Sequence, residues 1–450
     1  MYQKIIEIYE AIEKKFHVKH NTSLSSLIVT PSDNKESPIH NWYNFKEGYS
    51  KNILENVLQF SNIKEPIHLL DPFCGSGTTI LSSMIDVENW DIKSAIGIEV
   101  NPFIHFIAQT KSNFHHIDSG IVYNFINFLK KQELYEPIKQ EEIPDLSTFQ
   151  KAYSHNTLVQ LINLKKIIRN YFNCESFEYD FCLLAFASIL EETSCMRKSG
   201  RALKIVREVM DYDVKKHYLT KLYSMINDLN YPLLNTPKVE ILNYDIRNSS
   251  VLSQVKEKFN LIVFSPPYLN QFDYTEVYKL ELWMLDYVKN QEEFKSLRRK
   301  TLRSHSSLKF DETNIYQKHD SKLIRQIAKF IDNADKKESF HRTIKGYIDD
   351  MYITLSNISN LSQNNAVIAC VVGNSLFGSS KKNNFMPVAT DLIISEIADD
   401  IGFEVIEIQK IRNLTRRGLS FPYGRESIIF MRSKVNSKYN VNVLKQTESK

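Results

Sequence analysis

The stretch PIHLLDPFCGSGTTILSSMID, residues 66–86, decides the fold. Its first half is a short apolar run, which predicts a strand, and Gly75 and Gly77 then mark a tight turn. From residue 78 the apolar side chains recur at helical spacing, which predicts a helix. A second strand, SAIGIEV at 94–100, follows the helix. These segments predict the first half of an α/β domain.

Strands and helices alternate again after a long helical stretch in the middle of the chain. Two closing strands, at 403–411 and 426–435, have no helix between them and predict an antiparallel hairpin at one edge. The predicted fold class is therefore α/β, a doubly wound and mostly parallel sheet with a helical insertion. The predicted divisions are 1–111 (N-terminal helices and first half of the α/β domain), 112–235 (helical insertion), 236–435 (second half) and 436–450 (flexible tail).

Composition excludes several classes of protein. The 450 residues are 42% hydrophobic, enough for one large core or two ordinary ones. No apolar run approaches the roughly 20 residues that span a bilayer, and residues 1–16 lack the pattern of a signal peptide, so we expect a cytoplasmic protein without a membrane segment. The five cysteines form no C-x-x-C pair and no cluster with histidine. We therefore expect neither a metal site nor disulfide bonds.

The glycine turn and three acids suggest a ligand. The turn lacks the third glycine of a dinucleotide site and the Gly-Lys-Ser/Thr of a phosphate loop. Asp71, just before the glycines, would repel a pyrophosphate but attract a cation or an ammonium group. Glu99 ends the second strand, where an acid can accept hydrogen bonds from ribose, and Asp245 could accept from an adenine amino group. Cation, ribose and adenine together describe S-adenosylmethionine; in the simpler interpretation these are ordinary strand-end acids beside a tight turn.

A second motif, Ser265-Pro266-Pro267-Tyr268, ends another strand-like run. Two consecutive prolines cannot continue a hydrogen-bond ladder, so they fix a rigid bend. The bend presents a hydroxyl, a carbonyl without a competing N–H and an aromatic ring. The alternative is that it only caps a strand at the edge of the sheet.

Four motifs together resemble the S-adenosylmethionine-dependent DNA amino-methyltransferases, in particular those that act on the N4 amino group of cytosine. They are DPFCGSGTT (71–79), GIEVNP (97–102), NYD (243–245) and SPPY (265–268). HNWYNFKEGYS (40–50) resembles the segment that covers the methionine part of the cofactor in this family. The resemblance implies a Rossmann-like methyltransferase sheet, S-adenosyl-L-methionine as cofactor and double-stranded DNA as substrate. It also implies a restriction-modification system, with a cognate restriction endonuclease encoded nearby as a partner.

The family's functional residues carry over to matching positions. The implied cofactor-binding residues are Trp42, Tyr43, Lys46, Asp71, Pro72, Phe73, Gly75, Ser76, Gly77, Thr78, Thr79, Glu99, Asn101, Asp245 and Ile246. The implied catalytic residues are Ser265, Pro266, Pro267 and Tyr268.

The catalytic turn has an expected role for each group. Acceptors at Ser265 and Pro266 would hold the amino lone pair toward the methyl group. Tyr268 would stack on a base rotated out of the duplex. Adenine-specific relatives usually carry an acid at the position of Ser265, so serine favours cytosine. Carbon-5 methylation is disfavoured, because Cys74 lacks the preceding proline of that nucleophile.

Basic clusters are candidate phosphate contacts, although the net charge of +4 is small. Charge runs are also common on solvated faces. The predicted DNA-binding residues are Arg197, Lys198, Arg201, Arg298, Arg299, Arg303, Arg416 and Arg417. Base readout could come from the helical insertion or from 290–340. The alternatives left open are a DNA adenine-N6 methyltransferase, an RNA methyltransferase and a DNA-binding subunit without activity.

Overall fold

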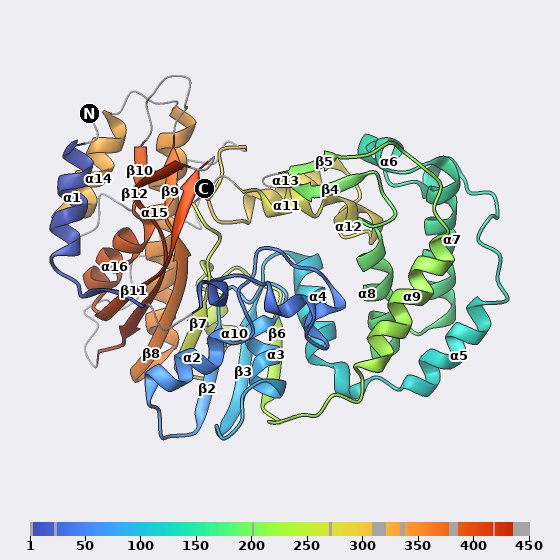
Figure 1. Cartoon of the computed structure of the whole chain (residues 1–450), viewed down its shortest axis with the longest axis horizontal. Helices are drawn as coiled ribbons and strands as arrows, with labels where there is room; N and C mark the ends of the chain where they lie inside the picture. The colour runs from blue at the N-terminus through green and yellow to red at the C-terminus, as the bar shows by residue number, and fades with distance from the viewer. Residues whose placement is uncertain are drawn as a thin grey trace.

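The computed structural model shows an α/β lobe beside a helical lobe (Figure 1). The structure describes residues 3–21, 25–199, 202–269, 272–307, 321–333, 338–377, 386–416 and 419–434. The predicted tail at 436–450 lies outside the described residues.

The α/β lobe is built on an eight-stranded sheet of order β1-β11-β12-β8-β7-β2-β3-β6. Its strands are β1 (Val18–His20), β11 (Glu404–Arg416), β12 (Leu419–Arg432), β8 (Ser362–Gly373), β7 (Phe259–Phe264), β2 (Ile67–Asp71), β3 (Ile92–Ile98) and β6 (Lys238–Leu242). Strands β8, β7, β2, β3 and β6 are parallel to one another. The predicted fold class is confirmed.

Helices cover both faces of the sheet because its central strands are apolar on both sides. All six residues of β7 are buried. Ile262 and Phe264 pack with α1 (Gln3–Glu13), α14 (Lys322–Asp332), α15 (Glu338–Leu361) and α16 (Thr390–Ile401). The alternate residues, Leu261 and Val263, pack in a separate cluster with α2 (Ile53–Ser61). This alternation is the period of two that sets a strand between two layers of helices.

The closing hairpin is present, but one strand lies outside it. Strand β12 pairs antiparallel with both β11 and β8. The edge is formed by β1, which pairs parallel with β11. At three residues, β1 is too short to show periodicity in the sequence, and its brevity limits the open edge that it exposes.

The helical lobe combines two distant parts of the chain. The first part holds α5 (Ser119–Leu129), α6 (Ser147–Ala152), α7 (His155–Tyr171), α8 (Phe177–Ile189), α9 (Val214–Asn227) and the hairpin β4 (Met196–Ser199) and β5 (Ala202–Ile205). The second part follows the Ser-Pro-Pro-Tyr turn and holds α11 (Tyr274–Val277), α12 (Lys279–Met284) and α13 (Gln291–Arg299). Lys165 Nζ donates to the carbonyl of Met284 at 2.9 Å, and Arg169 pairs with Asp286 at 2.6 Å. The chain therefore returns to this lobe directly after the Ser-Pro-Pro-Tyr turn.

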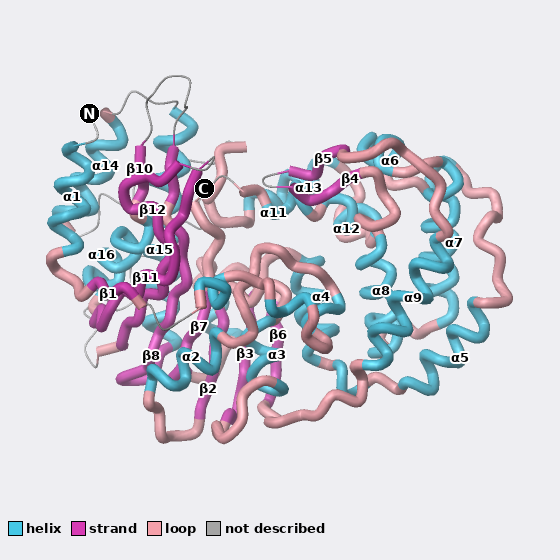
Figure 2. The backbone as a smooth tube through the Cα atoms, in the orientation of Figure 1, coloured by secondary structure: helices cyan, strands magenta, loops and turns pink. Residues whose placement is uncertain are grey.

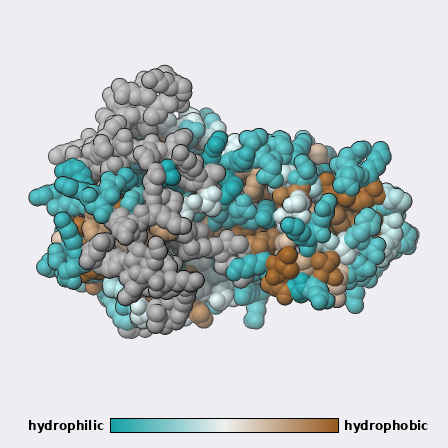
Figure 3. Space-filling view, turned by 90° about the horizontal axis from the view of Figure 1, so that it is seen from above, coloured by the Kyte–Doolittle hydropathy of each residue, from teal (hydrophilic) through white to brown (hydrophobic). Residues whose placement is uncertain are grey.

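The surface seen from above is largely hydrophilic, with apolar patches on the part that is not grey (Figure 3). Four large apolar residues shortly after the start of β5 are about half exposed: Ile205, Val206, Val209 and Met210. Within the described ranges, no helix is long and apolar enough to cross a membrane.

Candidate cofactor and catalytic site

The predicted motifs converge where four parallel strands end. Figure 2 shows the loops after β2, β3, β6 and β7 gathered at one end of the sheet, facing the helical lobe. They enclose a cavity with about 940 Å³ of space, including the part open to solvent. Parallel α/β sheets bind their ligands at this carboxyl edge, and the volume suits a nucleoside-sized ligand.

The glycine turn is held close to a neighbouring helix. Gly75 and Gly77 have φ of 52° and 82°, which side chains disfavour. A Cβ on Gly77 would lie 3.1 Å from the Cα of Ala108 in α4 (Pro102–Ser112), so the turn packs against backbone. Gly75, Ser76 and Thr78, the first residue of α3 (Thr78–Ile85), line the cavity.

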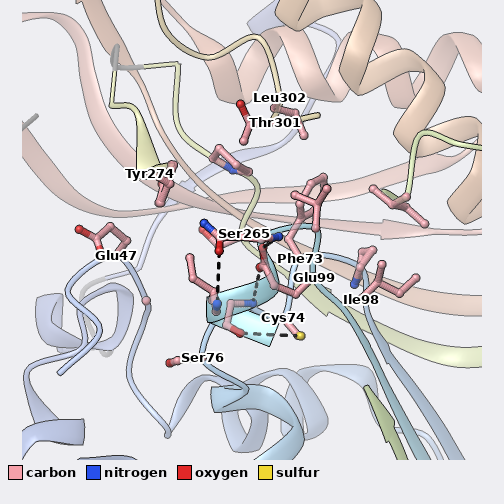
Figure 4. A pocket seen from close by; sticks show the side chains of 18 of the residues that line it. Glu47, Phe73, Cys74, Ser76, Ile98, Glu99, Ser265, Tyr274, Thr301 and Leu302 are labelled. Atoms are coloured by element: carbon pink, nitrogen blue, oxygen red, sulfur yellow. Dashed lines mark hydrogen bonds between the residues drawn. The ribbon is translucent and has the colours of Figure 1, made fainter. Parts of the chain in front are cut away.

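Glu99 ties the turn after β2 to the turn after β3. Its Oε2 accepts from the Gly75 N–H at 3.2 Å and its Oε1 from the Asn101 N–H at 2.8 Å. Burial raises the pKa of Glu99 to about 7. Figure 4 shows its carboxylate in the cavity near Cys74 and Phe73.

Asp71 supports the site from behind the cavity wall. It is 1% exposed and accepts from the Tyr49 hydroxyl and the Phe73 N–H, both at 3.1 Å. Burial raises its pKa to about 6. Tyr49 itself lines the cavity and also bonds to Thr79. Asp71 thus contacts the residues around a ligand rather than the ligand space.

Many of the predicted cofactor residues line this cavity: Pro72, Phe73, Gly75, Ser76, Thr78, Glu99, Asn101, Asp245 and Ile246. The others do not: Trp42, Tyr43, Lys46, Asp71, Gly77 and Thr79. Gly77 does not line the cavity because it packs on α4, and Thr79 does not because its hydroxyl bonds to Tyr49.

The segment at 40–50 corrects the expectation for its aromatic residues. Trp42 is fully buried, and its Nε1 donates to Asp228 at 2.9 Å. The Tyr43 hydroxyl donates to Glu281 at 2.7 Å, and Lys46 Nζ donates to the carbonyl of Lys198 at 3.1 Å. All three point toward the helical lobe's residues. The cavity is lined instead by their neighbours Phe45, Glu47, Gly48 and Tyr49.

The sequence interpretation also missed one wall. The loop after α13 lines the cavity with Lys300, Thr301, Leu302, Ser304 and His305. Figure 4 places Thr301 and Leu302 across the cavity from Cys74 and Ser76. The Arg-Ser-His stretch at 303–305 was the available signal, but the loop's charges suggested a phosphate contact instead.

The Ser-Pro-Pro-Tyr turn separates two adjoining cavities. The first is the cavity described above, which we call the cofactor cavity, and Ser265 and Pro267 line it. Tyr268 lines a second cavity with Phe272. Pro266 is buried between them in the turn and lines neither. Glu47, Gly48 and Tyr274 line both cavities. A group bound in the second cavity would therefore meet the cofactor cavity at this turn.

The Ser265 hydroxyl has a defined orientation. Its Oγ donates to the carbonyl of Val371 in β8 at 3.0 Å. Because a hydroxyl has one hydrogen, this bond leaves the oxygen with only acceptor lone pairs for a ligand.

The basic clusters need correction at several positions. Arg298 pairs with Asp273 at 2.6 Å and Arg303 with Asp350 at 2.7 Å, so buried acids hold these two side chains inside the protein. Lys198 is 3% exposed and pairs with Glu281. Arg197 donates to the carbonyl oxygens of Glu191 and Met196. Phosphate contact by these four does not fit the structure.

The remaining predicted DNA contacts divide in two. Arg299 is exposed and stays a prediction. Arg201 and Arg417 lie outside the described residues, and the structure describes only the backbone of Arg416.

The donor set fits S-adenosylmethionine. Acids line the space from three segments: Glu47 from the segment at 40–50, Glu99 beside the glycine turn and Asp245 after β6, as hydroxyl and amino donors require. The Nδ2 group of Asn101 is buried without a partner in the described part of the chain and lies on a residue that lines the cavity. Among the described residues, no group of three or more His, Cys, Asp or Glu side chains could hold a metal ion.

Two curated proteins are similar to this chain over most of its length. No family model matches the chain. The Type II methyltransferase M.BsoBI of Geobacillus stearothermophilus is 24% identical over 485 residues, covering 93% of this chain and 89% of that protein. The Type II methyltransferase M.AvaI of Nostoc sp. is 24% identical over 457 residues, covering 90% and 88%.

Similarity among solved structures is weak. The rRNA methyltransferase aviRa from Streptomyces viridochromogenes aligns with a TM-score of 0.30 and 10% identity over 89% of this chain and 92% of that one. The chain is similar to these two Type II methyltransferases along nearly its whole length.

Proposed function

We propose that the chain transfers a methyl group from S-adenosylmethionine to the N4 amino group of cytosine in double-stranded DNA, as the modification enzyme of a restriction-modification system. The observation that carries this proposal is the position of Ser265 on the wall of the cofactor cavity, in the turn that leads to Tyr268 of the second cavity, with its hydroxyl hydrogen bonded to Val371. The similarity to Type II methyltransferases supports DNA as the substrate.

The turn supplies an acceptor where an amino group needs one. S-adenosylmethionine, when bound, supplies an electrophilic methyl group. The Ser265 oxygen accepts an amino hydrogen of the base, which turns the nitrogen lone pair out of the ring plane and toward the cofactor cavity. Pro266 lines neither cavity, so the proposal does not include the acceptor role expected of its carbonyl. No covalent enzyme intermediate is needed. Burial raises the pKa of the Cys74 thiol well above its usual value, which argues against a cysteine nucleophile.

Tyr268 is held as a rigid platform for a base. Its hydroxyl donates to Glu426 at 2.7 Å, and buried Glu426 also bonds to Arg412. The ring lies directly on the backbone of Gly373, where a Cβ would come within 2.8 Å of the Tyr268 ring carbon Cε2. Glycine at 373 is therefore needed for the ring to occupy this place. Stacking on such a ring contributes about 1–3 kcal/mol per base.

The target base can be identified directly. The gene is expressed in a host without DNA methylation, and modified positions in the genome are mapped by sequencing that separates N4-methylcytosine from N6-methyladenine. We expect N4-methylcytosine at one recurring short sequence. N6-methyladenine there would replace our proposal by the adenine alternative, and unmodified DNA would contradict both.

Replacing Ser265 by alanine tests the catalytic turn. Ser265→Ala should lower kcat by about 100-fold or more, the usual effect of removing one acceptor or donor aimed at the reacting group. The Kd for S-adenosylhomocysteine, measured by calorimetry, should change less than about twofold, because we propose that the hydroxyl bonds to the amino group of the base and not to the cofactor. Ser83→Ala, which removes a hydroxyl bonded to the Ile80 carbonyl inside α3, is the matched control. Equal losses of turnover and cofactor affinity would contradict the assigned role.

Gly373→Ala tests the platform without touching a polar group. The added methyl must displace the Tyr268 ring, so we expect kcat on DNA to fall about 10- to 100-fold. Tyr268→Phe, which keeps the ring in place, should lose less. Fluorescence of 2-aminopurine at the target position reports base rotation, and this signal should weaken in Gly373→Ala. Unchanged turnover in Gly373→Ala would argue against stacking on Tyr268.

Cofactor binding should depend on pH through Glu99. The pKa of about 7 in the free protein means that Glu99 is partly protonated at neutral pH. Ribose hydroxyls and a cationic ligand favour the carboxylate, so binding releases protons and affinity rises from pH 6 to 8, then levels off. Calorimetry in two buffers at pH 7 should show release of about half a proton. In Glu99→Gln, affinity should be weaker and this pH dependence should disappear; a pH dependence that persists would assign it elsewhere.

A further inference from the structure

The loop at 300–305 is fixed by one buried carboxylate. Arg303 donates to Asp350 of α15 from its backbone N–H at 2.8 Å, from Nε at 3.2 Å and from its guanidinium at 2.7 Å. Asp350 is 2% exposed. Gly346, one turn earlier on α15, gives the Arg303 stem its space, since a Cβ there would lie 2.8 Å from Arg303 Cδ. The cavity wall at 300–305 is thereby anchored to α15.

The same carboxylate reaches the loop after β6 through Arg247. Arg247 pairs with Asp350 at 2.9 Å and with Asp245 at 2.6 Å, and it donates to the Lys300 carbonyl at 2.6 Å. Asp245 is the acid expected to face adenine, and its side chain is 24% exposed. One arginine thus connects the ligand-facing acid, the loop and the buried acid.

The network is balanced in charge, because Arg247 and Arg303 face Asp245 and Asp350. Burial raises the pKa of Asp350, but Arg247 and Arg303 outweigh it and hold that pKa below its usual value. Removing the Asp350 charge would leave two arginines with one carboxylate. Arg247 would then no longer be fixed by Asp350, so the geometry of its ion pair with Asp245 would change.

We propose that Asp350 is a positioning residue for adenine recognition, which orients Asp245 through Arg247 and the loop at 300–305 through Arg303. It touches no ligand itself. The proposal rests on the cofactor site of the proposed function and adds a residue from α15, outside the motifs that carry the family resemblance.

Discrimination between adenine and hypoxanthine tests the proposal. Calorimetry measures the Kd of S-adenosylhomocysteine and of S-inosylhomocysteine. The second ligand has an oxo group in place of the amino group from which Asp245 would accept a hydrogen bond. We expect wild type to prefer the adenine ligand by about 10-fold or more, because a site built to accept an amino hydrogen rejects an oxo group. In Asp350→Asn this preference should fall at least threefold, and in Asp245→Asn it should vanish.

The controls separate positioning from general stability. Asp391→Asn removes another buried carboxylate, paired with Arg425 at 2.6 Å away from the cavity lining. It should lower Tm as Asp350→Asn does but keep the wild-type preference. Arg303→Lys keeps the positive charge but loses the planar guanidinium with its several donors, so its preference for the adenine ligand should lie between those of wild type and Asp350→Asn. This variant also tests the proposal if Asp350→Asn does not fold.

The outcomes are distinct from those of the proposed function, since this assay contains no DNA. A wild-type preference retained in both Asp350→Asn and Arg303→Lys would overturn the positioning role, even if the wild type methylates DNA. A preference lost in these variants would support it, even if no DNA methylation were found.

Discussion

The carboxylate of Glu99 is the interaction on which the site depends. It accepts N–H groups from the turn after β2 and from the turn after β3, so one partly buried side chain sets the distance between two loops that line the cavity. Two unpaired backbone donors there would each cost about 1–3 kcal/mol. The raised pKa of Glu99 follows from the same burial. The two oxygen atoms that support the loops are therefore the same two that we propose to bind the ribose.

Local chemistry explains which parts of the site the sequence could predict. The strand, glycine turn and helix at 66–86 were predictable, because this one segment holds both the apolar pattern and the two glycines that adopt positive φ, Gly75 and Gly77. The segment at 40–50 was not, since its irregular backbone has no period that shows which side chain faces inward. Phe45 and Tyr49 line the cavity. Trp42 does not, and bonds instead to Asp228.

Long-range pairing explains the errors in the basic clusters. The sequence around Arg298 and Arg303 indicated a phosphate contact because residues 295–309 hold no acid. Their partners, Asp273 and Asp350, are 25 and 47 residues away and meet them only in the folded chain. The same is true of Lys198 and Glu281, which are 83 residues apart. The fold class, in contrast, depends on the order and apolar character of the strands and was predictable without these pairs.

The buried charges are better explained by geometry than by stability. Replacing a buried ion pair with apolar residues of similar volume is often neutral or stabilising, whereas losing one partner costs about 3–5 kcal/mol. A network that gains little over an apolar core still fixes angles, because the planar guanidinium groups of Arg247 and Arg303 must lie in line with the Asp350 oxygens. This constraint joins α15, which packs against the sheet, to a loop that the chain reaches only after passing through the helical lobe. One wall of the cofactor cavity therefore follows the helical lobe in the chain but is held in place by α15 of the α/β lobe.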